Sequence, residues 1–484
     1  MQALNRSLTT LGLNVTAESL ESMPAPVTGT HAARGTVVLT GVTVFRVALG
    51  LVTAALLTRA LGIDGYGKFL LILSLVVFLG VVFSIAADRV VTADTAREIG
   101  QGNYGRAKAF LVEFTTLMLV LGAAAGAAVL ILAPFAPGFF GDELSAHLDF
   151  AAFLVMTAAL RRIISVTLTI HGRFNQIAVM RSSESVLRLA SVIAFVVLLD
   201  RGLRGALAAE LVTGILVVAV GAFPAARAVS YLRPHKRPAR WVLPEAMRAH
   251  GKWAVAKSMA ITAVSQWRLW LVALVLDAEG AAVFGLTRRI LSVAKGVFPM
   301  RVVLDALYAR QVSNEAERAR LILQYAVKYK LLVAVGLIVA GNVIADPLIR
   351  LTFPDLYPQT VLVFRIMLLM LVGKTVSDAV NPYMNAIQAQ RYGFIVFVIG
   401  LIGWAAVAPP LVLLLGVEGA AIEIAFATAL TGLVTYRFAK RADPSLSIDW
   451  LGLVRYGRDD FEILKRVALR RRADQPVAGS ADRS

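Results

Sequence analysis

The sequence predicts an all-α polytopic membrane protein whose roughly twelve transmembrane helices form two parallel six-helix lobes around a central cavity. Three observations lead to this fold class: the apolar composition, the length of the apolar runs, and a repeat between the two halves of the chain. Of the 484 residues, 58% are hydrophobic and 17% are charged. An average soluble protein is roughly 45–50% apolar and about 25% charged, so a buried core alone does not account for the composition.

The apolar residues are concentrated in runs that match or exceed the ~20 residues that a helix needs to cross a bilayer. Polar and charged loops separate these runs, as expected for helices that enter and leave a membrane. We expect spans near residues 36–60, 66–92, 106–134, 146–172, 178–199, 203–227, 253–276, 281–307, 322–351, 358–385, 391–415 and 418–439.

The two halves of the chain resemble each other weakly but in order, at an offset of about 214 residues. Six spans per half is an even number, so both halves enter the membrane from the same side and form parallel repeats. Such a two-lobed body can rock about a central cavity, which is the geometry of alternating access. The matching positions are Gly65 with Gly280, Arg97-Glu98 with Arg310-Gln311, and Gly205-Ala206 with Gly419-Ala420.

The loops between the spans alternate in charge. One set is basic and includes Arg97, Arg106 and the segment 227–252, whereas the opposite set is acidic and includes Asp142 and Glu143. The positive-inside rule places the basic loops and both termini in the cytoplasm. We therefore expect a cytoplasmic N-terminal tail (1–35), an N-lobe (36–228), a basic cytoplasmic linker (229–252), a C-lobe (253–440) and a basic cytoplasmic C-terminal tail (441–484).

The composition also excludes several classes of function. The net charge of +18 lies mostly in loops, so the positive-inside rule explains it and no nucleic acid partner is needed. The chain has no cysteine, and its five histidines are scattered, so we expect no metal site and no cofactor. The outer loops are too short for a catalytic domain, so we do not expect an enzyme.

The two ends of the chain give weaker signals. Residues 1–34 lack the apolar core of a signal peptide, and we expect the first transmembrane helix to serve as an uncleaved signal. The tail segment Trp450–Arg472 mixes apolar and basic residues. It fits an interfacial helix on anionic lipid and a solvated basic tail equally well.

Several cations fall inside the predicted spans, where ionisable groups are costly and usually face protein or water. Arg46 lies about nine residues into the first span, ~13 Å along the helix and near mid-membrane. Lys257 and Arg268 lie about eleven residues apart in the seventh span and share one helical face. Arg288 and Lys295 share a face of the eighth span in the same way.

Acids at comparable depth are few, mainly Glu113, Glu210 and Glu423. Uncompensated cations in a water-filled cavity call for an anionic ligand, and the planar fork of arginine suits phosphate oxygens. Among these acids, Glu113 is the candidate for ion coupling. The residues expected to bind an anionic substrate are Arg46, Arg268, Arg288, Arg365, Lys257 and Lys295.

The alternative for each interior cation is a local partner. A buried arginine can pair with a helix C-terminus, or extend its head group toward the membrane surface. For Arg161, Arg162 and Arg289, we give such a local partner the same weight as a role in the cavity. Glu184 and Arg188 are four residues apart near a cytoplasmic end, so they are interpreted as a local helical pair.

The first hairpin carries a motif that resembles a known family. The segment LLTRALGIDGYGKFLLILSLVVFLG is similar to the first hairpin of polysaccharide-biosynthesis flippases in the multidrug/oligosaccharidyl-lipid/polysaccharide exporter superfamily. That hairpin has the pattern R-x-L-G-x-x-x-Y-G-x-F between two apolar runs, and the glycines and tyrosine of the turn also have a purely structural explanation. The matching residues here are Arg59, Leu61, Gly62, Tyr66, Gly67 and Phe69.

The resemblance implies a transporter of the bacterial inner membrane. It would move a polyprenyl-pyrophosphate-linked oligosaccharide, such as an O-antigen, capsule or exopolysaccharide unit, between leaflets, with possible H⁺ or Na⁺ coupling. Family members are thought to hold the pyrophosphate in a cationic cavity lined partly by helices one, two, seven and eight. Arg46, Arg268 and Arg288 lie on matching helices, and the polyprenyl tail would stay in the membrane lipid.

Three alternatives remain at the level of sequence. An ion-coupled drug or small-molecule exporter of the same superfamily has the same layout, although a cavity for cationic drugs should be acidic. A lipid II flippase commonly carries extra helices. A membrane glycosyltransferase or polysaccharide polymerase would need a larger outer loop or a catalytic acid pair. The sequence does not identify the glycan, the lipid carrier, the energy source or the oligomeric state.

Overall fold

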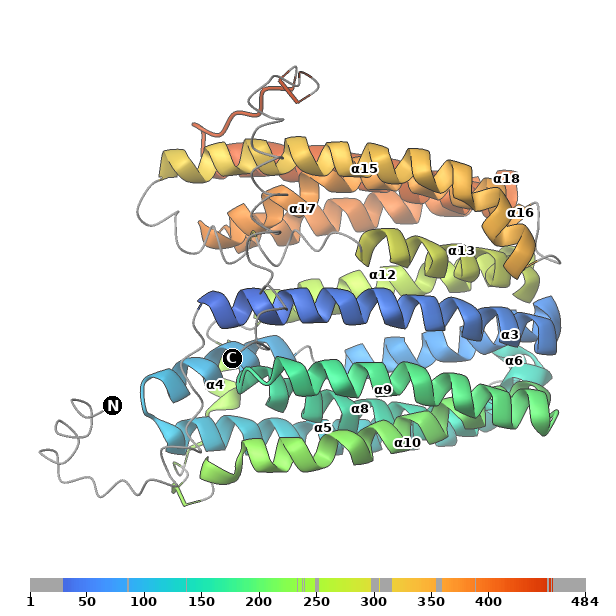
Figure 1. The fold of residues 1–484 in the computed structure, drawn as a ribbon, viewed down its shortest axis with the longest axis horizontal. Coiled ribbons are helices and arrows are strands. Elements are labelled where there is room, and N and C mark those ends of the chain that lie inside the picture. The colour runs from blue at the N-terminus through green and yellow to red at the C-terminus, as the bar shows by residue number, and fades with distance from the viewer. Residues whose placement is uncertain are drawn as a thin grey trace, which may run out of the picture.

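The protein is a bundle of long helices arranged in two lobes (Figure 1). The computed structural model describes residues 29–455, apart from 85–86, 136, 233, 237, 239, 249–251, 297–303, 305–315, 354–358, 388, 451 and 454. No strand occurs within these described residues. The tail segment Trp450–Arg472 falls mostly outside them, so its expected interfacial helix has no structural test.

The N-lobe contains six long helices, and short turns join them. The loop between α5 and α8 holds α6 (Pro137–Phe140) and α7 (Asp142–Ser145), and α9 continues into a π-helical turn, Ile193–Leu198. The long helices are α3 (Gly29–Ser84), α4 (Ala87–Gly100), α5 (Tyr104–Leu132), α8 (Leu148–Ile170), α9 (Phe174–Val192) and α10 (Gly202–Ala228).

The C-lobe begins after a linker that contains the one-turn helix α11 (Leu243–Ala246). A single residue separates α16 from α17, and the two together form one span of membrane length. The helices are α12 (Lys252–Leu276), α13 (Ala278–Gly296), α15 (Ala316–Thr352), α16 (Gln359–Leu368), α17 (Met370–Ala386) and α18 (Gln390–Ala442).

Two of these helices are really hairpins. Gly62 has φ 70° and divides α3, and Gly416 has φ 63° and divides α18. Glycine adopts a positive φ at no steric cost, so the chain can reverse direction between two helices at each of these residues. We call the end of the bundle that contains Gly62 the kink end, and the opposite end, where α3 begins, the terminal end; in Figure 1 they lie at the right and the left.

The positive-φ turns repeat between the lobes. Gly62 corresponds to Asp277, which has φ 119°, and Gly202, with φ 53°, corresponds to Gly416. Both pairs have nearly the offset of about 214 residues that relates the halves of the sequence. Asp277 tolerates the turn because its carboxylate accepts a hydrogen bond of 2.9 Å from the Gly280 amide, a local bond typical of aspartate at a helix start.

The number of membrane-length segments agrees with the sequence. Within the described residues, eight helical units are long and apolar enough to cross a membrane. The kinks divide two of them, and α9 and α13 are shorter or more polar helices that complete the two lobes. The protein is therefore an all-α polytopic membrane protein.

One predicted span boundary differs from the structure. The second span was expected to reach residue 92, but α3 ends at Ser84 and the polar helix α4 begins at Ala87. Charged residues such as Asp88 and Arg97 give α4 its polar character and favour a separate helix outside the apolar layer. The eighth span is predicted to reach residue 307, and this end lies outside the described residues, because the structure describes the helix to Gly296.

The hydrophobic core shows how the lobes meet. One large cluster joins both lobes at the kink end and includes Leu57, Phe69 and Ile72 together with Val272 and Phe284. At the terminal end the buried residues fall into separate clusters, one for each lobe. The lobes therefore pack tightly at the kink end and have separate cores at the terminal end.

Candidate functional site: two arginine-lined cavities

Two polar cavities lie in the N-lobe and at its boundary with the C-lobe. A cavity of about 560 Å³ opens between α3, α5, α8 and α9, and its walls are otherwise apolar. We call it the N-lobe arginine cavity. Its charged lining residues are Arg46, Arg161, Arg162, Arg181, Asp88 and Glu184.

A second cavity of about 330 Å³ lies between the lobes, and we call it the interlobe arginine cavity. Arg46 lines this cavity too, so it borders both. Arg188 comes from α9, and Arg289 reaches over from α13 toward Gly50 of α3. A Cβ at Gly50 would lie 3.5 Å from the Arg289 guanidinium, an ordinary van der Waals contact, so the arginine packs against α3 at this glycine.

Glu184 is the carboxylate on which the arginines converge. Its oxygens lie 3.0 Å from Arg161 Nη1, 3.1 Å from Arg188 Nη2 and 3.8 Å from Arg46 Nη2. Arg188 has a second partner, because its Nε lies 2.8 Å from Glu210 of α10. Glu184 thus holds guanidinium groups from α3, α8 and α9 around one point.

The carboxylates do not balance the arginines. Together the two cavities are lined by six arginines and two carboxylates, Glu184 and Asp88. The buried Nε of Arg46 has no hydrogen-bond partner among the described residues. Buried donors without partners are rare and costly in folded proteins, so the arrangement is suited to an acceptor group supplied by an anionic ligand.

Arg162 faces a different part of the N-lobe cavity. Its Nη1 donates a hydrogen bond of 2.7 Å to the Gly80 carbonyl of α3, and its Nε lies 3.7 Å from Asp88 of α4. It therefore ties the end of the first hairpin to α8 at the edge of the cavity.

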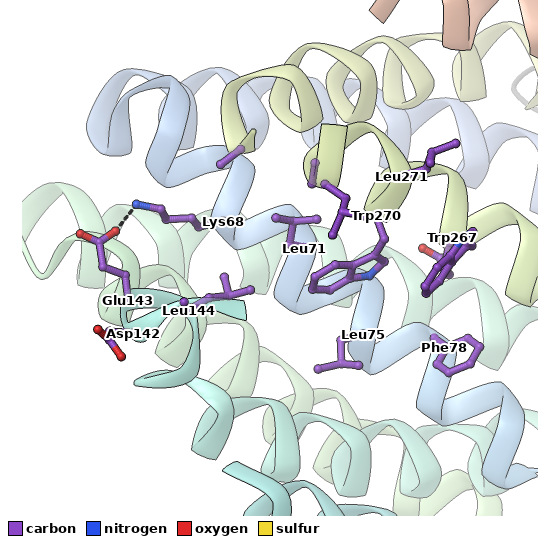
Figure 2. A pocket seen from close by; sticks show the side chains of 15 residues that line it. Lys68, Leu71, Leu75, Phe78, Asp142, Glu143, Leu144, Trp267, Trp270 and Leu271 are labelled. Atoms are coloured by element: carbon purple, nitrogen blue, oxygen red, sulfur yellow. Dashed lines mark hydrogen bonds and ion pairs between the residues drawn. The ribbon is translucent and has the colours of Figure 1, made fainter. Parts of the chain in front are cut away.

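A third cavity has the opposite character. It has a volume of about 640 Å³, is almost entirely apolar, and lies between the lobes toward the kink end. We call it the apolar pocket; Figure 2 shows Leu71, Leu75 and Phe78 of α3 facing Trp267 and Trp270 of α12. Its charged rim consists of Lys68, Asp142 and Glu143.

The predicted site residues are distributed between these surroundings. Arg46 lines both arginine cavities. Arg268 forms a two-point ion pair with Glu423 of α18, at 2.9 and 2.8 Å. Arg288 donates hydrogen bonds of 2.8 Å to the carbonyl and the hydroxyl of Ser265, and its guanidinium lies 5.7 Å from the centre of the Phe284 ring.

Of the remaining predicted cations, the structure describes the side chain of Arg365 alone. Arg365 is exposed on α16 and lines neither of them. Lys257 and Lys295 belong to α12 and α13, but their side chains lie outside the described part of the structure.

The pairing of Arg268 changes the charge balance expected in the C-lobe. Glu423 is only 2% exposed and takes both of its hydrogen bonds from that arginine. Two-point arginine–carboxylate pairs are among the strongest side-chain interactions. The charge of Arg268 is thus compensated within the C-lobe, whereas the cavities of the N-lobe and the lobe boundary are lined by more arginines than carboxylates.

Glu113 has the surroundings of a structural residue. It is 3% exposed, and its carboxylate accepts hydrogen bonds from the amides of Val242 and Leu243, the shortest at 2.8 Å. These amides precede and begin α11, so a carboxylate there satisfies donors that the helix cannot. Lys108 donates to the His235 carbonyl at 3.0 Å. Glu113 and Lys108 therefore anchor the linker to α5.

Sequence reasoning gave too little weight to Arg161, Arg162, Arg289, Glu184 and Arg188. The signal that could have found them is the run Arg181–Arg188 on α9. It repeats charged and hydroxyl residues inside a segment predicted to cross the membrane, and a polar helical face at that depth faces protein or water. The identity of the partners on α3 and α8 could not have been read from that run.

Comparisons with known proteins show the fold. No protein-family model and no curated protein sequence matches the chain. Among solved structures, an inward-facing multidrug resistance MATE family transporter of the MOP superfamily is similar, with a TM-score of 0.69 and 17% identity over 84% of this chain and 95% of that chain. An outward-facing structure with the same family description has a TM-score of 0.59 and 15% identity over 87% and 96%.

A third similar structure is a MOP superfamily transporter from Pyrococcus furiosus, with a TM-score of 0.62 and 14% identity over 89% of this chain and 99% of that chain. Its description states that a reverse polarity of the binding pocket suggests a different function for that protein. At these identities the comparisons establish a shared architecture over most of the chain.

Proposed function

We propose that this chain is a secondary transporter that binds an anionic substrate in the arginine cavities and exposes it to each side of the membrane in turn. The observation that carries the proposal is the lining of these cavities, with six arginines against two carboxylates. Arg46 and Arg289 belong to different lobes and line the same cavity. A substrate bound there would contact both lobes, so its contacts would change when the lobes move.

A phosphate-bearing group fits this lining best. Arginine presents several donors in a plane and can bind two phosphate oxygens at once. Among the described residues, Glu184 supplies the carboxylate that Arg46, Arg161 and Arg188 share. A phosphate or pyrophosphate would replace this carboxylate on at least Arg46, whose contact with Glu184 is the longest of the three.

The arrangement of the lobes supports an alternating-access cycle. The shared core closes the kink end, whereas the arginines lie on the side of the terminal end. If the basic loops and the termini are cytoplasmic, as the positive-inside rule predicts, this state is inward-facing. The greater similarity to the inward-facing solved structure supports the same assignment.

The substrate class has two candidates, and the first is a small anionic molecule. The similar solved structures are described as multidrug transporters, which favours a small-molecule exporter, ion-coupled or not, over a flippase. The arginine lining restricts this candidate to anions, because a cavity for cationic drugs would carry an excess of carboxylates. The Pyrococcus furiosus transporter is a precedent for a change of pocket polarity on this architecture.

The second candidate is a polyprenyl-pyrophosphate-linked oligosaccharide. The resemblance of the first hairpin to polysaccharide-biosynthesis flippases favours it, and a pyrophosphate is the group that the arginines would bind. The tail would remain in the lipid while the head group occupies the N-lobe arginine cavity. H⁺ or Na⁺ coupling remains part of both candidates.

Binding of inorganic pyrophosphate to the full chain in lipid nanodiscs tests the proposal. We expect calorimetric binding that weakens with added salt, and a loss of roughly tenfold or more in Arg46→Gln and Arg161→Gln, since a charged hydrogen bond contributes about 1.5–3 kcal/mol. Arg391→Gln, an exposed residue at the start of α18, is the matched control. Equal affinities in all four proteins, or binding of a lipophilic cation instead, would contradict the proposal.

A further inference from the structure

The apolar pocket is a binding site that the proposed transport function does not use. Leu71, Leu75 and Phe78 come from the second leg of α3, in the N-lobe, whereas Trp267 and Trp270 come from α12, in the C-lobe (Figure 2). We propose that this pocket holds an acyl chain of a bilayer phospholipid whose head group carries an ammonium, such as phosphatidylethanolamine.

The walls of the pocket match a hydrocarbon chain. They belong to two helices that are long and apolar enough to cross a membrane. Trp267 is 57% exposed and Leu274 is 79% exposed at the mouth, so the pocket opens to the side of the bundle. In a membrane that side is lipid, and a volume of about 640 Å³ is within the range that holds a drug-sized ligand.

Water is a poor occupant of this space. A water molecule in a cavity needs two to four polar partners, and the deep part of the pocket offers apolar side chains. A lipid chain removes these side chains from water at no desolvation cost to itself. The physical chemistry of the lining therefore selects hydrocarbon.

The rim selects the head group. Lys68 is held by the carboxylates of Asp64 and Glu143, so its charge is already compensated. Asp142 is exposed at the same rim and has no cationic partner among the described residues. The rim thus carries more negative than positive charge, which attracts an ammonium and repels a purely anionic head group.

The occupant is a bilayer lipid rather than the tail of a transported lipid, because α3 separates the pocket from the arginine cavities. Leu71, Leu75 and Phe78 lie on one face of its second leg, whereas Val76 and Gly80 line the N-lobe arginine cavity on the other. A helix is about 10 Å in diameter. A substrate whose head group lies among the arginines would have to pass around this helix.

The occupied pocket would stabilise the closed kink end. An acyl chain in the pocket would contact both lobes next to the place where Gly67 meets Ala278. Ala278 itself lines the pocket. A ligand that binds only one of two states shifts the equilibrium toward it. The lipid would therefore favour the state in which the lobes meet at the kink end.

Photolabelling of the full chain in phosphatidylglycerol vesicles tests the proposal. The probe is phosphatidylethanolamine with a diazirine in its acyl chain, and labelled residues are identified by mass spectrometry. We expect labels concentrated within residues 71–78 and 266–274, and a loss of this labelling when Leu75→Trp fills the pocket. Ile261→Trp, which is exposed on α12 outside the pocket lining, is the control and should label as the original chain does.

The head group is tested by a phosphatidylglycerol probe with the same chain. We expect roughly two- to fivefold less labelling than with phosphatidylethanolamine, the size of an exposed ion-pair effect, and no such difference in Asp142→Asn. Ala273→Leu is a milder filling variant should Leu75→Trp fail to fold. Labelling spread evenly around the bundle, labelling unaffected by a folded filling variant, or equal labelling by the two probes would each overturn the proposal, whatever the transport assays show.

Discussion

At the scale of single residues, Glu184 organises the site. Its carboxylate neutralises one charge but contacts three arginines from three helices, so it holds them close together before any ligand arrives. Removing like-charge repulsion in this way prepares the cavity for an anion, and it also supplies a competitor for the same donors. Both effects matter for the proposed transport cycle, because a substrate that binds too tightly is not released.

The variant Glu184→Gln separates these two effects. It removes the competing charge and leaves a side chain of similar shape, so we expect pyrophosphate to bind roughly tenfold more tightly, a change of ~1.4 kcal/mol. Titration calorimetry measures the change. Glu279→Gln, an exposed carboxylate on α13, is the control and should bind as the original chain does. Weaker binding in a folded Glu184→Gln protein would show that Glu184 serves only to position the arginines.

The sequence allowed part of this residue-level account. Arg46 was identified from its depth in the first span, and the structure places it between the two cavities. The pairing of Arg268 with Glu423 joins residues 155 positions apart, and Glu184 was interpreted as a local partner of Arg188 alone. Periodicity shows which face of a helix a residue occupies, but it does not show which helix faces it.

At the scale of elements, the first hairpin is the point where the lobes meet. Gly67 follows the kink of α3, and its backbone approaches the carbonyl of Ala278 so closely that a Cβ would overlap it. Gly285 of α13 makes a similar contact with Leu70. These glycines allow α3 and α13 to approach each other, so part of the glycine-rich motif serves the contact between lobes as well as the turn.

A side chain at position 67 should prevent this approach. We expect Gly67→Leu to shift the population toward a state that is open at the kink end, because the lobes cannot close without displacing the backbone of α13. The chain has no native cysteine, so labelling of a single Leu70→Cys with a membrane-impermeant maleimide measures the opening. Labelling should rise in the Gly67→Leu background.

The control for this variant is Gly41→Leu, because a Cβ at Gly41 of α3 meets no other atom within 4 Å. It should leave the labelling of Leu70→Cys unchanged. If folded Gly67→Leu protein is labelled no faster than this control, the contact between Gly67 and Ala278 does not close the kink end.

The elements themselves were largely predictable. Long apolar runs defined the spans, and two of the three repeated anchor pairs, Gly65 with Gly280 and Gly205-Ala206 with Gly419-Ala420, lie near positive-φ turns. The end of the second span was predicted too late, because the polar helix α4 has no apolar period to mark where one helix stops and another starts. The linker was predicted as a basic loop, and its attachment to α5 through Glu113 depends on a contact between residues 129 positions apart.

At the scale of the whole molecule, the two lobes share an architecture but not a charge distribution. The C-lobe compensates Arg268 internally through Glu423, whereas the N-lobe leaves an excess of arginine around two cavities. Rocking of the lobes about the shared core at the kink end would change the interlobe arginine cavity most, because Arg46 and Arg289 would separate. The affinity for an anion would then differ between the two states, as a transport cycle requires.

The most direct test of this account is transport selectivity in proteoliposomes. A single fluorophore would be supplied in two forms of similar size, one bearing a phosphate and one bearing a trimethylammonium group. The account predicts movement of the phosphate form that is lost in Arg46→Gln and retained in Arg391→Gln, with little movement of the cationic form. Movement of the cationic form alone, unaffected by Arg46→Gln, would contradict it.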